Sequence, residues 1–176
     1  MKNLEVFTIP KTKNHREESE FCFEKLIEIC KSKYNYTVDR DRIGKNKHGK
    51  PYFIDNPNLH YNISHSHGLG VILFDERPCG VDVEQIVEKK YDLSERFYSQ
   101  REREWVNEVK DAKEHAKRLL AVWTGKEAYT KMLGVGLTVD LKTINIFDDE
   151  IWNKLTYINE NGYIICVCRE SGGAKN

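Results

Sequence analysis

The stretch Gly80-Val81-Asp82-Val83-Glu84 is the part of the sequence on which the predicted fold and chemistry depend most. Side chains of a β-strand point alternately to the two faces of a sheet, so the valines face the core and the two acids face the other side. Neighbouring carboxylates repel each other, but a hard divalent cation such as Mg²⁺ prefers oxygen ligands of this kind. The stretch therefore predicts a strand with one apolar and one acidic face. Taken alone, it also fits the exposed polar face of an edge strand.

A second charged stretch runs from Trp123 to Lys131 and has the composition of a helix. It reads Trp-Thr-Gly-Lys-Glu-Ala-Tyr-Thr-Lys, and its Glu127 and Lys131 are four residues apart, so they share a helix face with Trp123. An ordinary surface pair of this kind contributes only about 0.2–0.5 kcal/mol and is common in helical proteins. The tryptophan beside it indicates that this face is partly buried.

A third polar stretch, residues 62–67, reads Asn-Ile-Ser-His-Ser-His. Adjacent serine and histidine invite comparison with a serine hydrolase, but the sharp glycine-flanked turn that carries such a nucleophile is missing here. The hydroxyl of Ser64 and the ring of His65 could instead hydrogen-bond a phosphate. His67 is equally compatible with a structural histidine.

Composition excludes several broad classes of protein. The chain has 176 residues, with 28 Lys or Arg and 28 Asp or Glu, so its formal net charge is zero. This size fits one domain, or two small lobes that share a core. A general nucleic-acid binder needs an excess of clustered basic residues, which the balanced charge does not provide. No apolar run approaches the roughly 20 residues of a membrane span, and the first apolar stretch contains Glu5, so we expect a first β-strand there instead of a signal peptide.

The cysteines indicate a reducing environment. There are five of them (Cys22, Cys30, Cys79, Cys166 and Cys168), and no pair has the C-x-x-C spacing of zinc sites or thioredoxin-like motifs. We therefore expect buried free thiols in a cytoplasmic protein.

The order of elements along the chain predicts a mixed α+β fold. Apolar periodicity predicts one helix over residues 15–34 and a stronger one over 115–133, which Gly134 and Gly136 would end. Ser99 and Glu102 have the spacing of a capping box. Residues 39–50 look like an exposed loop. Short strands are expected at 52–54, 59–63, 70–74, 80–83, 143–147, 152–158 and 163–168, with a turn at 161–162.

Together the stretches are more specific than any one of them. In chain order they are Gly49-Lys50-Pro51, residues 62–66, residues 80–84 and the helix from Trp123 to Lys131, with Gly134-Val-Gly136-Leu137 behind it. In this order the chain resembles the 4′-phosphopantetheinyl transferase superfamily, in its pseudo-dimeric branch, the type that activates surfactin synthetase. The resemblance covers roughly residues 49–137, with a weaker echo from His15-Arg16 onward.

The resemblance implies an α+β fold of two pseudo-symmetric lobes. Each lobe would hold a small antiparallel sheet and a long helix, with the active site in the cleft between them. We expect an N-terminal lobe over residues 1–88 and a C-terminal lobe over residues 89–176. Because one chain supplies both lobes, a monomer would suffice.

The implied reaction moves the 4′-phosphopantetheine arm of coenzyme A to a serine of an apo acyl or peptidyl carrier protein and releases adenosine 3′,5′-bisphosphate. By resemblance, Asp82, Glu84 and Glu127 would hold Mg²⁺, or Mn²⁺ in its place. Glu127 would take the proton from the carrier serine, directly or through a water. Lys131 would bind the pyrophosphate and stabilise the leaving group, and Lys126 would assist with a phosphate.

Further contacts to coenzyme A follow from the same resemblance. Lys50 and Pro51 match the segment that lies along the adenine. Ser64 and His65 match a pair that contacts phosphate. Arg16 matches an arginine for the 3′-phosphate, although one short gap is needed, and a solvated charge at a helix start explains it equally well.

The chain departs from the family pattern near its ends. The additional N-terminal lysines that bind the 3′-phosphate in typical members have no clear counterparts, and Lys11 and Lys13 are only candidates. A carrier, generally acidic around its serine, could dock on residues 87–98. In that segment Leu93 and Phe97 are interleaved with the basic residues Lys89, Lys90 and Arg96.

Two other functions remain open at this point. An Asp-x-Glu pair followed by Glu and Lys on a helix also describes many metal-dependent phosphodiesterases and nucleases, although the neutral charge disfavours nucleic acid. A non-catalytic module that binds coenzyme A or a carrier is the other alternative. The complete set of carboxylates argues against it, because a relic site would be free to lose them.

Overall fold

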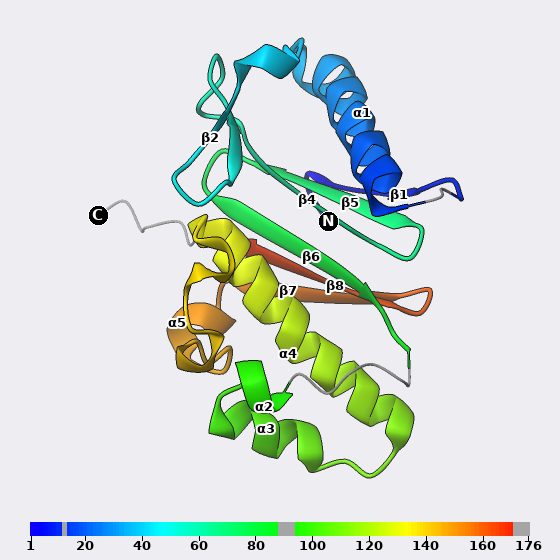
Figure 1. Cartoon of the computed structure of the whole chain (residues 1–176), viewed down its shortest axis with the longest axis vertical. Helices are drawn as coiled ribbons and strands as arrows, with labels where there is room; N and C mark the ends of the chain where they lie inside the picture. Colours follow the sequence, from blue (N-terminus) through cyan, green and yellow to red (C-terminus); the bar gives the residue numbers. More distant parts are fainter. Residues whose placement is uncertain (12–13, 88–93, 171–176) are drawn as a thin grey trace.

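The computed structural model describes residues 1–11, 14–87 and 94–170. It confirms the mixed α+β class: two three-stranded antiparallel sheets, each packed against a long helix, lie next to each other (Figure 1). All five cysteines are buried and free, as expected. Among the described residues, no helix has the length and apolar character needed to cross a bilayer.

The first sheet has the strand order β1-β5-β4 and packs against α1 (His15–Tyr34). Asn14 caps the start of this helix through its side chain, which accepts the main-chain N–H groups of Arg16 and Glu17. A separate two-stranded sheet, β2-β3, lies between α1 and β4 in the sequence. The strands are β1 (Leu4–Thr8), β2 (Ile43–Lys45), β3 (Pro51–Phe53), β4 (His60–Ser66) and β5 (Leu69–Asp75), and a short 3-10 turn, η1, spans Arg40–Arg42.

The second sheet has the order β6-β8-β7 and packs against α4 (Ala112–Leu133). Its strands are β6 (Cys79–Gln85), β7 (Leu155–Glu160) and β8 (Tyr163–Arg169). The remaining elements are α2 (Ser94–Phe97), α3 (Gln100–Asn107), η2 (Gly136–Thr138), η3 (Leu141–Thr143) and α5 (Asp149–Trp152). The lobe boundary after residue 88 stays a prediction, and strand pairing crosses it, since β6 bonds to β8.

The helix ends follow the sequence signals. Gly134 ends α4 in the left-handed conformation, with φ of 69°, which glycine adopts without steric cost. Ser99 and Glu102 form the predicted capping box at the start of α3. The glycine end matters for the site because it fixes how far α4 runs along β6.

The two sheets are joined through strands β4 and β6, which contact each other without sharing a sheet. The side chain of Asn62 accepts the main-chain N–H of Val81 at 2.8 Å, and Ser64 Oγ accepts that of Val83 at 3.4 Å. Side chains from β5, β6 and β8 form a buried hydrophobic cluster that both sheets share. Polar side chains of β4 therefore position the backbone of β6 across one continuous core.

Of two strand predictions near the C-terminus, one was wrong and the other placed the start of its strand too early. Residues 143–147 do not form a strand, because carbonyl groups of Leu141 and Ile144 accept the Lys126 amine and the N–H of Ile146 bonds to Glu102. The strand predicted at 152–158 begins later, at Leu155, because helix α5 occupies Asp149–Trp152. The loop predicted at 39–50 contains η1 and β2.

Candidate active site

A pocket of about 300 Å³ gathers the three polar stretches of the sequence. It lies where α1, β4, β6 and α4 meet, and each of these elements contributes side chains to it. The lining residues are His15, Ile63, Ser64, His65, Asp82, Val83, Glu84, Trp123, Glu127 and Lys131. Asp82 and Glu84 thus share one face of β6, as predicted.

The amine of Lys131 lies between two of the carboxylates. Its Nζ is 2.7 Å from Asp82 Oδ1 and 3.9 Å from Glu127 Oε2. Ser64 Oγ donates to the same Asp82 oxygen at 2.8 Å, and Lys131 also donates to Ser64 at 3.3 Å. Groups from β4, β6 and α4 therefore form one hydrogen-bonded cluster around Asp82.

The electrostatics of the pocket indicate an excess of negative charge. Burial raises the pKa of Asp82, and Glu84 raises it further, although Lys131 and Ser64 oppose the shift. Burial likewise raises the pKa of Glu127, with contributions from both carboxylates of β6. For Lys131, burial acts to lower the pKa, but the surrounding carboxylates outweigh it and raise the pKa. One amine thus compensates only part of the charge of three carboxylates.

The pocket fits a divalent cation in its chemistry, although a cation would have to rearrange it. Asp82 is only 5% exposed, and its buried Oδ2 has no hydrogen-bond partner among the described residues. An unpaired buried carboxylate oxygen is costly, and a hard cation would satisfy it. Within residues 1–11, 14–87 and 94–170, however, no three His, Cys, Asp or Glu side chains already lie close enough together to hold a metal.

Four polar residues lie together at the end of the pocket next to α1, and we call this end the histidine end. They are His15, Glu18, Ser19 and His65. The rings of His15 and His65 lie 4.6 Å apart. Glu18 Oε2 is 3.3 Å from His65 Nδ1, and Ser19 Oγ is 3.1 Å from His65 Nε2. Burial lowers the pKa of His65, and so does the neighbouring His15, while Glu18 opposes them.

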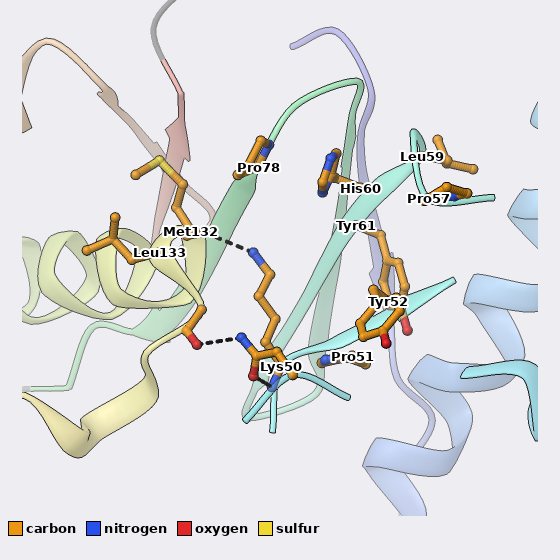
Figure 2. A pocket seen from close by; sticks show the side chains of 12 residues that line it. Lys50, Pro51, Tyr52, Pro57, Leu59, His60, Tyr61, Pro78, Met132 and Leu133 are labelled. Atoms are coloured by element: carbon orange, nitrogen blue, oxygen red, sulfur yellow. Dashed lines mark hydrogen bonds between the residues drawn. The ribbon is translucent and has the colours of Figure 1, made fainter. Parts of the chain in front are cut away.

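Lys50 and Pro51 line a different pocket, of about 310 Å³, at the C-terminal end of α4 (Figure 2). The amine of Lys50 donates to the carbonyl groups of Cys79 and Met132 at 2.9 and 3.1 Å, and burial lowers its pKa. Figure 2 shows this side chain crossing from the β3 side to the end of α4. The pocket is lined by Asn46, Lys50, Pro51, Tyr52, Pro57, Leu59, His60, Tyr61, Pro78, Met132, Leu133 and Gly134.

Two predicted site residues do not join either pocket. Lys126 is fully buried, and its amine pairs with Glu102 at 2.7 Å, so it stabilises the junction of α3 and α4 and does not face the carboxylate pocket. Arg16 is exposed in the first turn of α1 and is not among the residues that line either pocket.

Several residues in or beside the pocket were not predicted from the sequence. Ser66 donates to Glu84 Oε2 at 2.9 Å, and the alternation that places Ser64 on this face could have indicated it. Glu18 and Ser19 had no such signal, because their role depends on how α1 crosses the end of β4.

Comparison with known proteins identifies the family of the chain. Residues 78–175 match the family described as "4′-phosphopantetheinyl transferase superfamily". The chain is 34% identical over 154 residues to the 4′-phosphopantetheinyl transferase ffp of Bacillus subtilis, covering 80% of the chain and 68% of that protein. The chain belongs to the 4′-phosphopantetheinyl transferase superfamily.

Two further relatives match the chain over part of their own length. The 4′-phosphopantetheinyl transferase Sfp of Bacillus subtilis (strain 168) is 29% identical over 148 residues, which are 76% of this chain but 66% of Sfp. The 4′-phosphopantetheinyl transferase gsp of Aneurinibacillus migulanus is 33% identical over 99 residues, 56% of this chain and 40% of the relative. The matches therefore span two fifths to about two thirds of the length of these relatives.

Proposed function

We propose that this chain transfers the 4′-phosphopantetheine arm of coenzyme A to a serine hydroxyl of an apo acyl or peptidyl carrier protein. The observation that carries the proposal is the convergence of Asp82, Glu84, Glu127 and Lys131 on one pocket. Family membership supports the class of reaction. Because the pocket is lined from a single chain, a monomer would suffice for the reaction.

The transfer replaces one phosphorus–oxygen bond with another. The serine oxygen attacks the phosphorus that carries the pantetheine arm, the bond to the bridging oxygen on the adenosine side breaks, and adenosine 3′,5′-bisphosphate leaves. Glu127 accepts the serine proton as a general base. The Lys131 amine leaves Asp82 and stabilises the charge that develops on the leaving group.

Asp82, Glu84 and Glu127 are the residues that would hold Mg²⁺ or Mn²⁺, which supplies neutralisation of the pyrophosphate oxygens when bound. Ser64 donates a hydrogen bond to Asp82 and Ser66 donates one to Glu84, and these bonds keep the two carboxylates of β6 oriented. His65 contributes to phosphate contact from the histidine end. Lys50 and Pro51 would hold the adenine in the second pocket, which Figure 2 shows.

The carrier would dock at helix α2, where it packs beside Trp123 of α4. Phe97 packs on Trp123 with ring centroids 5.5 Å apart, and Arg96 supplies a positive charge next to it. The other residues predicted for this surface, Lys89, Lys90 and Leu93, lie outside the described residues, as does Lys13.

Intact-mass spectrometry of the carrier tests the proposal. The protein is incubated with Mg²⁺, coenzyme A and an apo carrier, and the carrier should gain the mass of one phosphopantetheine arm. Absence of any gain with fatty-acid, polyketide and non-ribosomal peptide carriers would contradict the proposal. Cleavage of DNA or RNA instead would support a phosphodiesterase, and coenzyme A binding alone would support a non-catalytic module.

Glu127→Gln tests the assigned base within the same assay. Loss of the base should lower the transfer rate by about 10²–10⁴-fold, the usual contribution of a positioned general base, while the melting temperature stays close to that of the parent. Glu114→Gln is the matched control, since Glu114 lies on the same helix in exposed surface pairs. Near-normal transfer by Glu127→Gln would rule out this role for it.

A further inference from the structure

The turn between β4 and β5 contains a histidine in a backbone conformation that favours other residues. His67 has a φ of 47°, in the left-handed region that glycine and asparagine adopt most readily. The other non-glycine residues with positive φ in the described part of the chain are all asparagines: Asn3, Asn35 and Asn161. The main-chain carbonyl of His67 accepts a hydrogen bond from the Tyr163 hydroxyl at 2.7 Å, which ties this turn to β8. A side chain kept at such a position is a candidate for a role outside the turn.

The side chain of His67 is connected to Glu84 through one intermediate residue. Ser66 Oγ donates to Glu84 Oε2 at 2.9 Å and lies 3.0 Å from His67 Nδ1. Ser66 is buried, and neither Ser66 nor His67 lines the pocket. The hydrogen bonds therefore run from the protein surface, where His67 is exposed, to a carboxylate of the pocket.

The direction of these hydrogen bonds follows from the protons that each group can supply. A serine hydroxyl has one proton and a carboxylate only accepts, so the Ser66 proton lies on the bond to Glu84. The bond between Ser66 and His67 is then donated by the Nδ1–H of the ring. Such a donor polarises the hydroxyl and strengthens its bond to the carboxylate. A ring that donates from Nδ1 cannot accept there, so the hydroxyl does not turn away from Glu84.

We propose that His67 is a positioning residue of the metal site: it donates to Ser66, Ser66 donates to Glu84, and the two bonds hold the Glu84 carboxylate in the orientation that binds the cation. Groups that hydrogen-bond a metal ligand from behind raise metal affinity by orienting that ligand. The inference rests on the proposed function, because it takes Glu84 as a ligand of Mg²⁺ or Mn²⁺. Because neither Ser66 nor His67 lines the pocket, metal affinity is the property that they should change.

Calorimetric titration of Mn²⁺ measures this affinity without a carrier, on the protein alone and on the protein saturated with coenzyme A. Ser66→Ala removes the direct partner of Glu84 and should raise the Kd for Mn²⁺ about tenfold, the lower end of the usual effect of such groups. His67→Gly removes only the second bond and suits the positive φ, so it should raise this Kd by less, about threefold. A Kd in His67→Gly that matches the parent would overturn the inference.

A conservative variant separates this role from a purely conformational one. In His67→Asn the side-chain amide nitrogen occupies the position of Nδ1 and can donate to Ser66, and asparagine also tolerates a positive φ. We therefore expect His67→Asn to bind Mn²⁺ as the parent does. Equal losses in His67→Asn and His67→Gly would contradict the donated bond.

Asn161→Gly is the matched control for the backbone. It removes a side chain at positive φ from the β7–β8 turn, which lies at the same end of the molecule as the β4–β5 turn (Figure 1). Its Kd for Mn²⁺ should equal that of the parent. A loss as large as that of His67→Gly would show that the glycine, and not the lost hydrogen bond, changes metal binding.

The double variant Ser66→Ala with His67→Gly tests whether the histidine acts through the serine. If it does, His67→Gly should add nothing to the Kd of Ser66→Ala, because the bond that it breaks is already absent. An additive loss would show that His67 affects the metal by another route and would overturn the inference.

The metal titrations keep this inference separate from the proposed transfer. If the variants shift the Kd as expected but the parent modifies no carrier, the inference stands and the transfer proposal fails. If the parent modifies a carrier while all variants bind Mn²⁺ as the parent does, the transfer proposal stands and the inference fails. If the parent binds no Mn²⁺, with or without coenzyme A, the inference fails together with the assigned metal ligands.

Discussion

The buried pair of Lys126 and Glu102 shows that the role of a residue, here Lys126, can differ from what its neighbours in sequence indicate. Both side chains are fully buried. The Lys126 amine also donates to the carbonyl groups of Leu141 and Ile144, and Glu102 accepts the N–H groups of Ser99 and Ile146. The pair thus fixes α3, α4 and the chain after η3 to one another.

Breaking this buried pair should lower the free energy of unfolding. Lys126→Met leaves the Glu102 carboxylate buried without its cation, and losses of this kind amount to about 3–5 kcal/mol in the free energy of unfolding. Lys117→Met on the same helix removes only a surface pair with Glu114, and should cost less than about 1 kcal/mol. Urea unfolding followed by circular dichroism measures both. Equal stabilities for the two variants would show that the buried pair is not structural.

At the residue scale, sequence reasoning succeeded where a regular repeat exists. Strand alternation placed Asp82 and Glu84 together, and helix spacing aligned Trp123, Glu127 and Lys131. Lys126 could not be placed this way, because its partner lies on another helix and only the folded chain brings the two together.

At the scale of elements, the packing of β6 on α4 explains why the second residue of the acidic strand is a glycine. A Cβ at Gly80 would lie 2.0 Å from the carbonyl oxygen of Ala128 and 2.5 Å from the main-chain N of Met132. The absence of a side chain lets the two backbones approach, and this approach brings Lys131 within reach of Asp82.

Gly80→Ala should therefore separate the strand from the helix. Because the obstructing atoms are backbone, we expect a loss of about 3 kcal/mol or more in the free energy of unfolding, at the upper end of overpacking effects. Gly162→Ala is the control, since nothing lies within 4 Å of its Cβ, and its φ of 81° alone should cost about 1–2 kcal/mol. The two variants are compared by urea unfolding. A Gly80→Ala protein more stable than Gly162→Ala would contradict this packing.

The elements themselves were predictable where the local signal was strong, as in α1, α4 and the capping box of α3. The strand expected at residues 143–147 failed for a tertiary reason. The apolar alternation is present, but the backbone of this segment bonds to Lys126 and Glu102 and leaves no ladder for a neighbouring strand. A local sequence pattern contains no information about a hydrogen bond to a side chain that is distant in the sequence.

At the scale of the whole molecule, the pocket lies on the seam between the two sheets. Strands β4 and β6 belong to different sheets and are connected there by side chains of Asn62, Ser64 and Ser66. The same serines that join the sheets also hold the carboxylates of β6. The position of the pocket is thus a consequence of how the two sheets meet, and this packing of distant strands is not specified by any local sequence pattern.

In the proposed reaction, Asp82, Glu84 and Glu127 hold one divalent cation once a nucleotide draws the Lys131 amine away from Asp82. A crystal structure of the chain with Mn²⁺ and coenzyme A tests it most directly, because Mn²⁺ can be located by its anomalous scattering. We expect one anomalous peak in contact with oxygens of all three carboxylates, with the Lys131 amine on the pyrophosphate. A peak elsewhere, or bound nucleotide with no peak and Lys131 still on Asp82, would contradict it.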